Sequence, residues 1–251
     1  MSMRLLAWSS LFALCGAAHA LPPDQIVERV SPGVWSLRTL DASNQPFNHG
    51  TAVAIAPGKA VTSCSVLLRA SKIELRREQT VLPATLEFPD VERDLCQLNA
   101  PGLQAPEPAR AATRLGQRVY AIGYERGTDL AIIDGLYSRV RDGGTNAERI
   151  QTSVTGAAGL IGAGLYDEEA RLLGVVTASP ADASTLLFAL PSKWRAELPE
   201  RGRAVLAARA AAPAKSAAGI PAVGASWRYR YADHRYPNNQ TYTVSVTRVD
   251  G

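Results

Sequence analysis

Histidine is scarce in this sequence, and its few imidazole groups are far apart. Of three histidines among 251 residues, His19 lies in the first 20 residues, which leaves His49 and His234 in distant parts of the chain. A zinc site needs several imidazole, thiolate or carboxylate ligands at short spacing. No such cluster occurs, so we expect neither a metal nor another cofactor.

Long apolar runs are absent after residue 20, so no later segment is long enough to cross a bilayer. The first 20 residues are different: Arg4 precedes an apolar stretch at residues 5–14, and residues 18–20 read Ala-His-Ala. This pattern is typical of a secretory signal peptide that is cut after Ala20. The alternative, an uncleaved membrane anchor, is disfavoured by the short apolar run. We therefore expect a periplasmic or secreted protein.

Cysteine is also rare, and beyond the predicted signal peptide only Cys64 and Cys96 remain. An even number of cysteines in an exported chain favours a disulfide over two buried thiols. The formal net charge is +4, but the arginines are scattered and flanked by acids. Such a charge is typical of a solvated surface and does not predict nucleic-acid binding.

Short β-type segments dominate the chain from about residue 24 to residue 190. Apolar or alternating runs at 34–40, 50–63, 72–78, 118–124, 130–140, 172–179 and 185–191 are separated by Gly, Pro, Asn and Asp. This pattern predicts an all-β barrel or sandwich. Two stretches read as helices, residues 22–32 and 191–210.

The last 50 residues change character. Ala, Pro, Gly and small polar residues dominate residues 205–225. Such a segment cannot bury enough apolar surface to become ordered. We assign 199–225 to an Ala/Pro-rich linker whose first part can prolong the preceding helix. Residues 226–251 alternate again around Pro237, which predicts a β-hairpin at the start of a second β module. The hairpin either docks on the first domain or belongs to a longer module.

Several segments, in order, resemble the trypsin-like serine peptidase family, especially its short exported bacterial members. HGTAVAIAPGKAVTSCSVL (49–67) resembles the glycine-rich strand and the histidine segment of that family, and ERDLCQL (92–98) resembles its aspartate strand. RVYAIGYERG (118–127) resembles the family's Ala-Ile-Gly-Asn-Pro-X-Gly turn. Residues 150–178 resemble the nucleophile loop, and TLLFALPSKW (185–194) the closing strand and helix. The resemblance covers residues 24–198 and implies two Greek-key β-barrels, with the reactive groups between them.

The resemblance also implies that two of the three catalytic positions hold unsuitable residues. The His position falls on Ser65, the Asp position on Asp94 and the nucleophile position on Ile161. A serine hydroxyl is nearly inert at neutral pH without a base, and a hydrocarbon can neither attack a carbonyl nor relay a proton. We therefore expect Asp94 to have become structural, with Ser65 supplying one hydroxyl donor to it.

Other features of a peptide-binding site do not need the triad. Gly159 and Ile161 can offer backbone N–H groups to a carbonyl oxygen, although both can also be part of a plain turn. Residues 177–179, Thr177, Ala178 and Ser179, match the strand on which the family pairs an extended substrate. Cys64 and Cys96 flank the Ser65 and Asp94 positions, so a bridge between them would tie these two loops together.

Three hypotheses follow. The first is an exported pseudopeptidase that binds a polypeptide or a partner protein without cutting it. The second is an active serine endopeptidase with a rearranged site, in which His49 serves as base and Ser63, Ser65 or Ser153 as nucleophile. The third is a scaffold that only displays the C-terminal module, favoured if Ile161 fills the crevice.

Overall fold

The computed structural model describes residues 20–104, 113–142, 148–155, 159–178, 186–211, 224, 226–231, 240–245 and 247. Residues 1–19 of the predicted signal peptide and His234 lie outside these residues. The chain divides into two compact units, Met1–Leu206 and Ala207–Gly251. Within the described part, no helix is long and apolar enough to cross a membrane.

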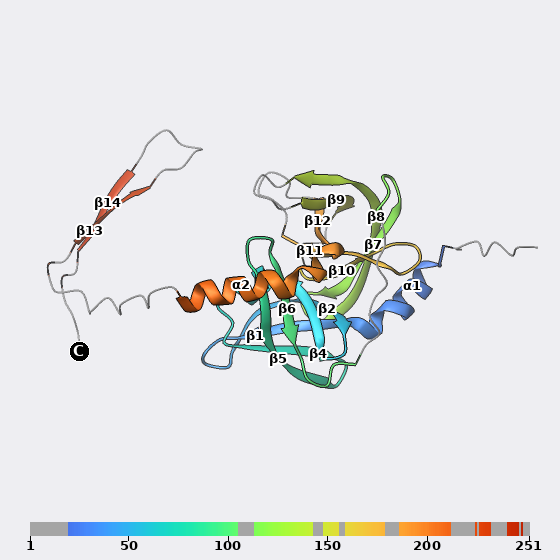
Figure 1. Cartoon of the computed structure of the whole chain (residues 1–251), viewed down its shortest axis with the longest axis horizontal. Helices are drawn as coiled ribbons and strands as arrows, with labels where there is room; N and C mark the ends of the chain where they lie inside the picture. The colour runs from blue at the N-terminus through green and yellow to red at the C-terminus, as the bar shows by residue number, and fades with distance from the viewer. Residues whose placement is uncertain are drawn as a thin grey trace, which may run out of the picture. The chain divides into compact units, whose positions relative to one another are not determined.

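The first unit contains two closed antiparallel β-barrels side by side, as Figure 1 shows, which confirms the predicted double-barrel fold. In the first barrel the strand order is β1-β2-β3-β6-β5-β4, and β4 returns to β1. Its strands are β1 (Val34–Leu40), β2 (Pro46–Ala56), β3 (Lys59–Ser63), β4 (Lys72–Arg77), β5 (Thr80–Asp90) and β6 (Leu95–Asn99).

In the second barrel the order is β10-β11-β12-β9-β8-β7, and β7 returns to β10. Its strands are β7 (Arg118–Glu125), β8 (Asp129–Asp142), β9 (Glu148–Thr155), β10 (Gly164–Tyr166), β11 (Leu172–Thr177) and β12 (Leu186–Pro191). The strand segments expected from alternation all correspond to observed strands. Strand β5 was not expected, because Pro83 and Pro89 interrupt its sequence.

The prolines of β5 are tolerated because each half of the strand has only one neighbour. Residues 80–84 pair with β4 alone, and residues 85–90 pair with β6 alone. Proline has no backbone N–H to donate, and it can therefore occupy the edge of β5 that has no partner strand.

Two helices frame the barrels. Helix α1 (Pro23–Val30) begins with a proline in its first turn and buries Ile26 and Val30, which confirms the predicted first helix. After the last strand, the 3-10 helix η3 (Ser192–Ala196) leads into helix α2 (Leu198–Ala211). Two further 3-10 turns are η1 (Ser31–Gly33) and η2 (Cys64–Leu67).

Each barrel has an apolar core, and a third cluster lies between the barrels. This inter-barrel core joins Val53 and Leu95 from the first barrel to Ile122 and Leu190 from the second, and Trp194 closes it. Burying large apolar side chains there holds the barrels against each other. The second unit contains a two-stranded sheet, β13 (Ser226–Tyr231) with β14 (Gln240–Ser245), where the sequence predicts a hairpin.

A small ion-pair group lies on the wall of the first barrel. Glu87 accepts hydrogen bonds from Lys59 (2.6 Å) and from the Gln97 amide (3.0 Å). Burial alone would raise the pKa of Glu87, but these two donors and the lysine charge bring it below its ordinary value.

Candidate functional site

The carboxylate of Asp94 is at the centre of the candidate site. It ends the tight turn between β5 and β6, in which its N–H donates to Val91 O at 3.2 Å. Asp94 has a φ of 62°, a left-handed conformation that aspartate tolerates better than most residues. The turn therefore places the side chain between the end of β3 in the first barrel and β11 in the second.

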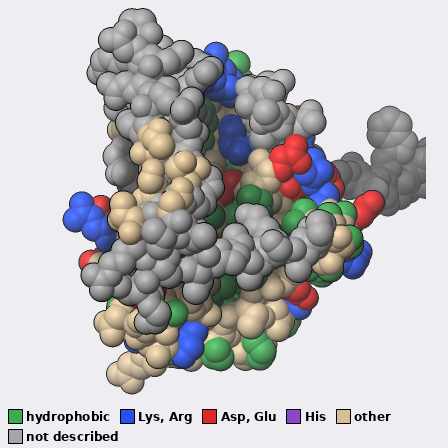
Figure 2. All heavy atoms as spheres, turned by 90° about the vertical axis from the view of Figure 1, so that its left-hand side faces the viewer, with side chains coloured by type: hydrophobic (Ala, Val, Ile, Leu, Met, Phe, Trp, Pro, Cys, Tyr) green, Lys and Arg blue, Asp and Glu red, His purple; other side chains and the backbone are tan. Residues whose placement is uncertain are grey.

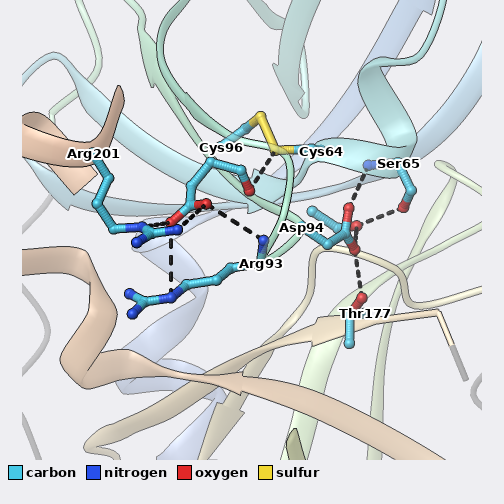
Figure 3. Close-up of a disulfide and its surroundings, with 9 residues drawn as sticks. Cys64, Ser65, Arg93, Asp94, Cys96, Thr177 and Arg201 are labelled. Carbon is cyan, nitrogen blue, oxygen red and sulfur yellow. Dashed lines mark hydrogen bonds and ion pairs between the residues drawn. A yellow bond between two sulfur atoms is a disulfide. The ribbon is translucent and has the colours of Figure 1, made fainter. Parts of the chain in front are cut away.

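Three donors converge on this carboxylate, and two of them, Ser65 and Thr177, are labelled in Figure 3. The Ser63 hydroxyl and the Thr177 hydroxyl each donate to Oδ2 at 2.5 Å, and the backbone N–H of Ser65 donates to Oδ1 at 2.8 Å. Thr177 belongs to β11 of the second barrel, so Asp94 links the two barrels. The Asp94 carboxylate thus accepts three hydrogen bonds, none of them from an imidazole.

Ser65 contacts Asp94 differently from the prediction. Its hydroxyl lies 2.5 Å from the Ser63 hydroxyl, while its backbone N–H reaches the carboxylate. Because Ser63 gives its single proton to Asp94, the Ser65 hydroxyl must be the donor to Ser63. Ser63 thus takes the place that the sequence analysis gave to the Ser65 hydroxyl.

The turn at the nucleophile position is rigidly held. Ala163 N–H donates to Leu160 O at 2.9 Å, which places Ile161 and Gly162 at the centre of a β-turn. Gly162 has a φ of 85°, and a Cβ added there would lie 2.0 Å from Thr51 O. Only glycine fits this position, both for backbone conformation and for space.

Ile161 is half-buried, and its side chain packs against the first barrel's apolar cluster. Its carbonyl oxygen accepts a hydrogen bond from Thr51 N–H at 2.8 Å. Among the described residues, neither the N–H of Gly159 nor that of Ile161 has a hydrogen-bond acceptor. Whether these two N–H groups receive a carbonyl oxygen therefore stays a prediction.

The predicted peptide-binding strand is only partly in view. Thr177 ends β11 and is buried with its hydroxyl on Asp94, and Ala178 follows as an exposed residue. Ser179 lies outside the described residues. Figure 2 shows a hollow on one face of the molecule, with basic, acidic and hydrophobic side chains visible within it.

His49, the proposed alternative base, lies on β2 and is exposed. Its imidazole lies beside Gly127, where an added Cβ would come within 2.9 Å of Nδ1. In the part of the chain that the structure covers, its ring makes no hydrogen bond to any serine. Ser153, another proposed nucleophile, accepts a hydrogen bond from Leu136 N–H instead. No cluster of three or more potential metal ligands occurs among the described residues.

A disulfide joins Cys64 to Cys96, as predicted, with their Cα atoms 5.0 Å apart. It ties the short helix that carries Ser65 to the strand that follows Asp94 (Figure 3). Both cysteines are buried. The bridge therefore fixes the two segments whose groups meet at the carboxylate.

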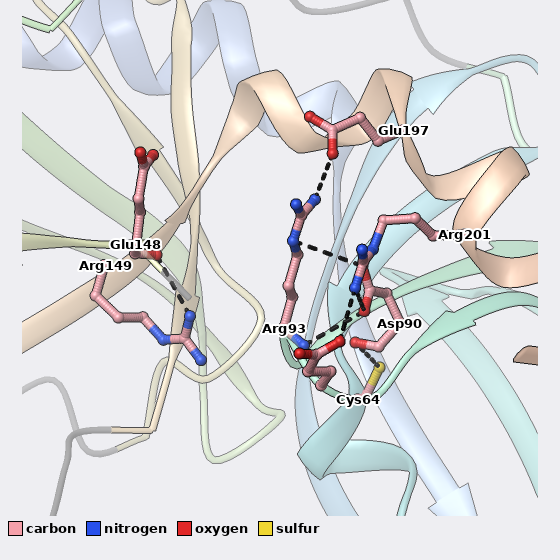
Figure 4. Close-up of polar contacts among 8 residues, drawn as sticks. Cys64, Asp90, Arg93, Glu148, Arg149, Glu197 and Arg201 are labelled. Atoms are coloured by element: carbon pink, nitrogen blue, oxygen red, sulfur yellow. Dashed lines mark hydrogen bonds and ion pairs between the residues drawn. The ribbon is translucent and has the colours of Figure 1, made fainter. Parts of the chain in front are cut away.

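The Asp94 turn is also fastened to the C-terminal helix, which the sequence did not indicate. Asp90, which is 2% exposed, receives two hydrogen bonds from the Arg201 guanidinium, at 2.5 and 3.2 Å. Next to Asp94, Arg93 stacks on Trp194 and pairs with Glu197 at 2.6 Å (Figure 4). The hydrogen bond to Asp90 raises the pKa of Arg201, so this cation is permanent.

The comparisons with known proteins agree with this architecture. A family model described as a trypsin-like peptidase domain matches residues 50–175, which include both the Asp94 turn and the Ile161 turn. No curated protein matches the sequence.

Several solved structures share the fold. The Rv3671c protease from M. tuberculosis in its active form is 20% identical with a TM-score of 0.64, covering 80% of this chain and 94% of that chain. The HtrA-type protease AlgW with a tripeptide is 27% identical with a TM-score of 0.62, covering 70% and 62%. The serine endoprotease from Yersinia pestis is 22% identical with a TM-score of 0.60, covering 71% and 65%. The chain thus spans less than two thirds of these last two proteins.

Proposed function

The chain belongs to the trypsin-like peptidase family, and from this premise we propose that it is an exported, catalytically inactive member that binds a polypeptide or a partner protein. The observation that carries the proposal is the hydrogen-bonding of Asp94. In an active serine peptidase this carboxylate orients an imidazole. Here two hydroxyls and a backbone N–H occupy it, and the nucleophile position implied by the resemblance holds Ile161, which packs against the first barrel's cluster.

Binding is supported by groups that do not depend on the missing catalytic residues. The N–H groups of Gly159 and Ile161 have no acceptor among the described residues and can donate to a carbonyl oxygen, and exposed Ala178 extends the strand that ends at Thr177. Export is supported by the signal-peptide pattern of residues 1–20 and by the disulfide.

Inactivity is tested with a fluorophosphonate probe that labels activated serines. The purified mature protein, starting at Leu21, should remain unlabelled under conditions that label an active trypsin-like peptidase completely. The active alternative requires labelling that depends on a base. Labelling that disappears both in His49→Ala and in one of Ser63→Ala, Ser65→Ala or Ser153→Ala would establish that alternative.

The scaffold hypothesis keeps one observation in its favour, the packing of Ile161 against the first barrel. It predicts that an unfolded polypeptide binds this protein no more tightly than it binds the surface of any other folded protein. Fluorescence anisotropy of a labelled, unfolded polypeptide separates the two functions. Saturable binding that weakens in Ala178→Pro, which cannot pair with an added strand, supports the peptide site.

Export is tested by the site of processing. Expression of the full chain in a bacterium should give a mature protein outside the cytoplasm whose first residue is Leu21, as read by N-terminal sequencing. Retention of residues 1–20 on a membrane-bound product would instead support the anchor alternative.

A further inference from the structure

Arg149 lies on the same face of the second barrel as Thr177, the residue of that barrel that meets Asp94. The strand register aligns Thr177 of β11 with Phe188 of β12, and Phe188 with Gln151 of β9. Residues two apart on a strand share one face, so Arg149 and Gln151 project to the same side as Thr177. Since the Thr177 hydroxyl contacts Asp94, this is the side that faces the first barrel.

The guanidinium of Arg149 has no carboxylate partner among the residues described. Its Nη1 donates only to the carbonyl oxygen of Glu148, at 3.3 Å. The Glu148 carboxylate pairs with Lys193 at 2.5 Å and points away from the guanidinium, as Figure 4 shows. Most of the five N–H donors of Arg149 therefore have no acceptor in the part of the chain that the structure describes.

Arg149 is half-buried, and this matters for its electrostatics. Burial lowers the pKa of Arg149, and the smaller opposing effect of the Asp94 charge raises it. Among the described residues Asp94 forms no ion pair with Arg149 and acts on it only through its charge, while its hydrogen bonds come from Ser63, Ser65 and Thr177. A partly desolvated cation without a counter-ion is costly, and an incoming carboxylate would remove that cost.

We propose that Arg149 is the anchor of a carboxylate-binding subsite, so that the polypeptide bound by this protein carries an acidic side chain or a free C-terminal carboxylate. The inference rests on the proposed peptide-binding function and specifies its ligand. Two strand spacings and a two-residue offset place Arg149 about 12 Å from Thr177. At about 3.3 Å per residue, the carboxylate lies three to four residues from the peptide segment beside Ala178.

The test uses three fluorescein-labelled decapeptide pools built from Ala, Ser, Thr and Val. The first carries one internal Glu and an amidated C-terminus, the second is neutral with a free C-terminal carboxylate, and the third is neutral and amidated. Binding to the mature full chain is measured by fluorescence anisotropy. The variants are Arg149→Gln, Arg149→Lys and the matched control Arg118→Gln, which removes one exposed arginine from the same barrel.

We expect one of the carboxylate pools to bind about tenfold more tightly than the neutral amidated pool. This difference in affinity should disappear in Arg149→Gln, persist in part in Arg149→Lys, and be unchanged in Arg118→Gln. Which pool is preferred identifies the source of the carboxylate. Equal binding of all three pools to the wild-type chain, or a preference that survives in Arg149→Gln, overturns the proposal.

A second readout separates this inference from the proposed function. The Nε–H resonance of Arg149, assigned by its loss in Arg149→Lys, is followed by NMR while N-acetyl-glutamate amide is added. If no pool binds but this resonance shifts saturably, the carboxylate subsite stands and polypeptide binding is wrong. If the pools bind and the resonance does not move, the peptide function stands and the subsite is overturned; if neither responds, both fail.

Discussion

Replacing Asp94 by Asn tests whether this carboxylate has become a structural element. The variant keeps the shape of the side chain but replaces one acceptor oxygen by an NH2 group. Whichever way the amide turns, it cannot accept from both hydroxyls and from the Ser65 N–H at once. At least one donor must lose its partner or reverse its hydrogen bond.

The expected loss follows from the three contacts. A hydrogen bond to a charged group contributes about 1.5–3 kcal/mol, and a neutral one about 0.5–1.5 kcal/mol. Three such exchanges amount to about 3 kcal/mol, and the smaller desolvation cost of the amide offsets part of this. We expect Asp94→Asn to lower the free energy of unfolding by about 2–3 kcal/mol.

The assay is urea unfolding followed by tryptophan fluorescence, with Asp134→Asn as the matched control. Asp134 is an exposed carboxylate paired with Arg118, so its loss should change the unfolding free energy by less than about 0.5 kcal/mol. If the two variants have the same stability, the carboxylate does not hold the barrels and the reasoning is refuted. A double-mutant cycle with Thr177→Val should give a coupling of about 1 kcal/mol across the barrels.

Three further predictions concern stability. Changing Cys64 and Cys96 to Ser should lower the free energy of unfolding by about 3–4 kcal/mol, the entropy of closing their loop, as measured by urea unfolding; no change would exclude the bridge. Gly162→Ala should cost about 3 kcal/mol or more, whereas Gly116→Ala, with a similar φ of 78° but open space, should cost only about 1–2 kcal/mol; equal losses would contradict the clash. Because the pKa of Glu87 is lowered, its ionised form stabilises the fold above its unfolded pKa. The stability difference between wild type and Glu87→Gln should therefore shrink as the pH falls below 4.5, and a constant difference would contradict this.

Much of the fold could be predicted because its signals are local in the sequence. Alternation and turn residues marked most strands, and the order of five motifs implied the double barrel. Strand β5 escaped this reading because its prolines break the pattern, and they are tolerated only because its two halves pair on opposite sides. That arrangement is a property of the closed sheet, which local sequence does not reveal.

The candidate site was predictable only in part. The family motifs located Asp94, Ser65 and Ile161, but not the donors Ser63 and Thr177, whose hydroxyls meet the carboxylate through tertiary packing. The sequence likewise could not show that Arg149 lacks a carboxylate partner among the described residues, since this depends on where every nearby carboxylate points. Only the closeness of Ser63 to Ser65 in the sequence was available as a signal, because Ser63 ends β3 and Ser65 lies in the 3-10 turn that follows.

The hydrogen bond between Thr177 and Asp94 joins residues 83 positions apart in the chain. Contacts of such separation carry a large loop-closure entropy and are formed after local pairings such as the β7–β8 hairpin. Each barrel should therefore acquire its sheets before the carboxylate receives its second-barrel donor. The proposed binding surface would then exist only at the end of folding, so a chain that is still partly unfolded could not engage the proposed ligand.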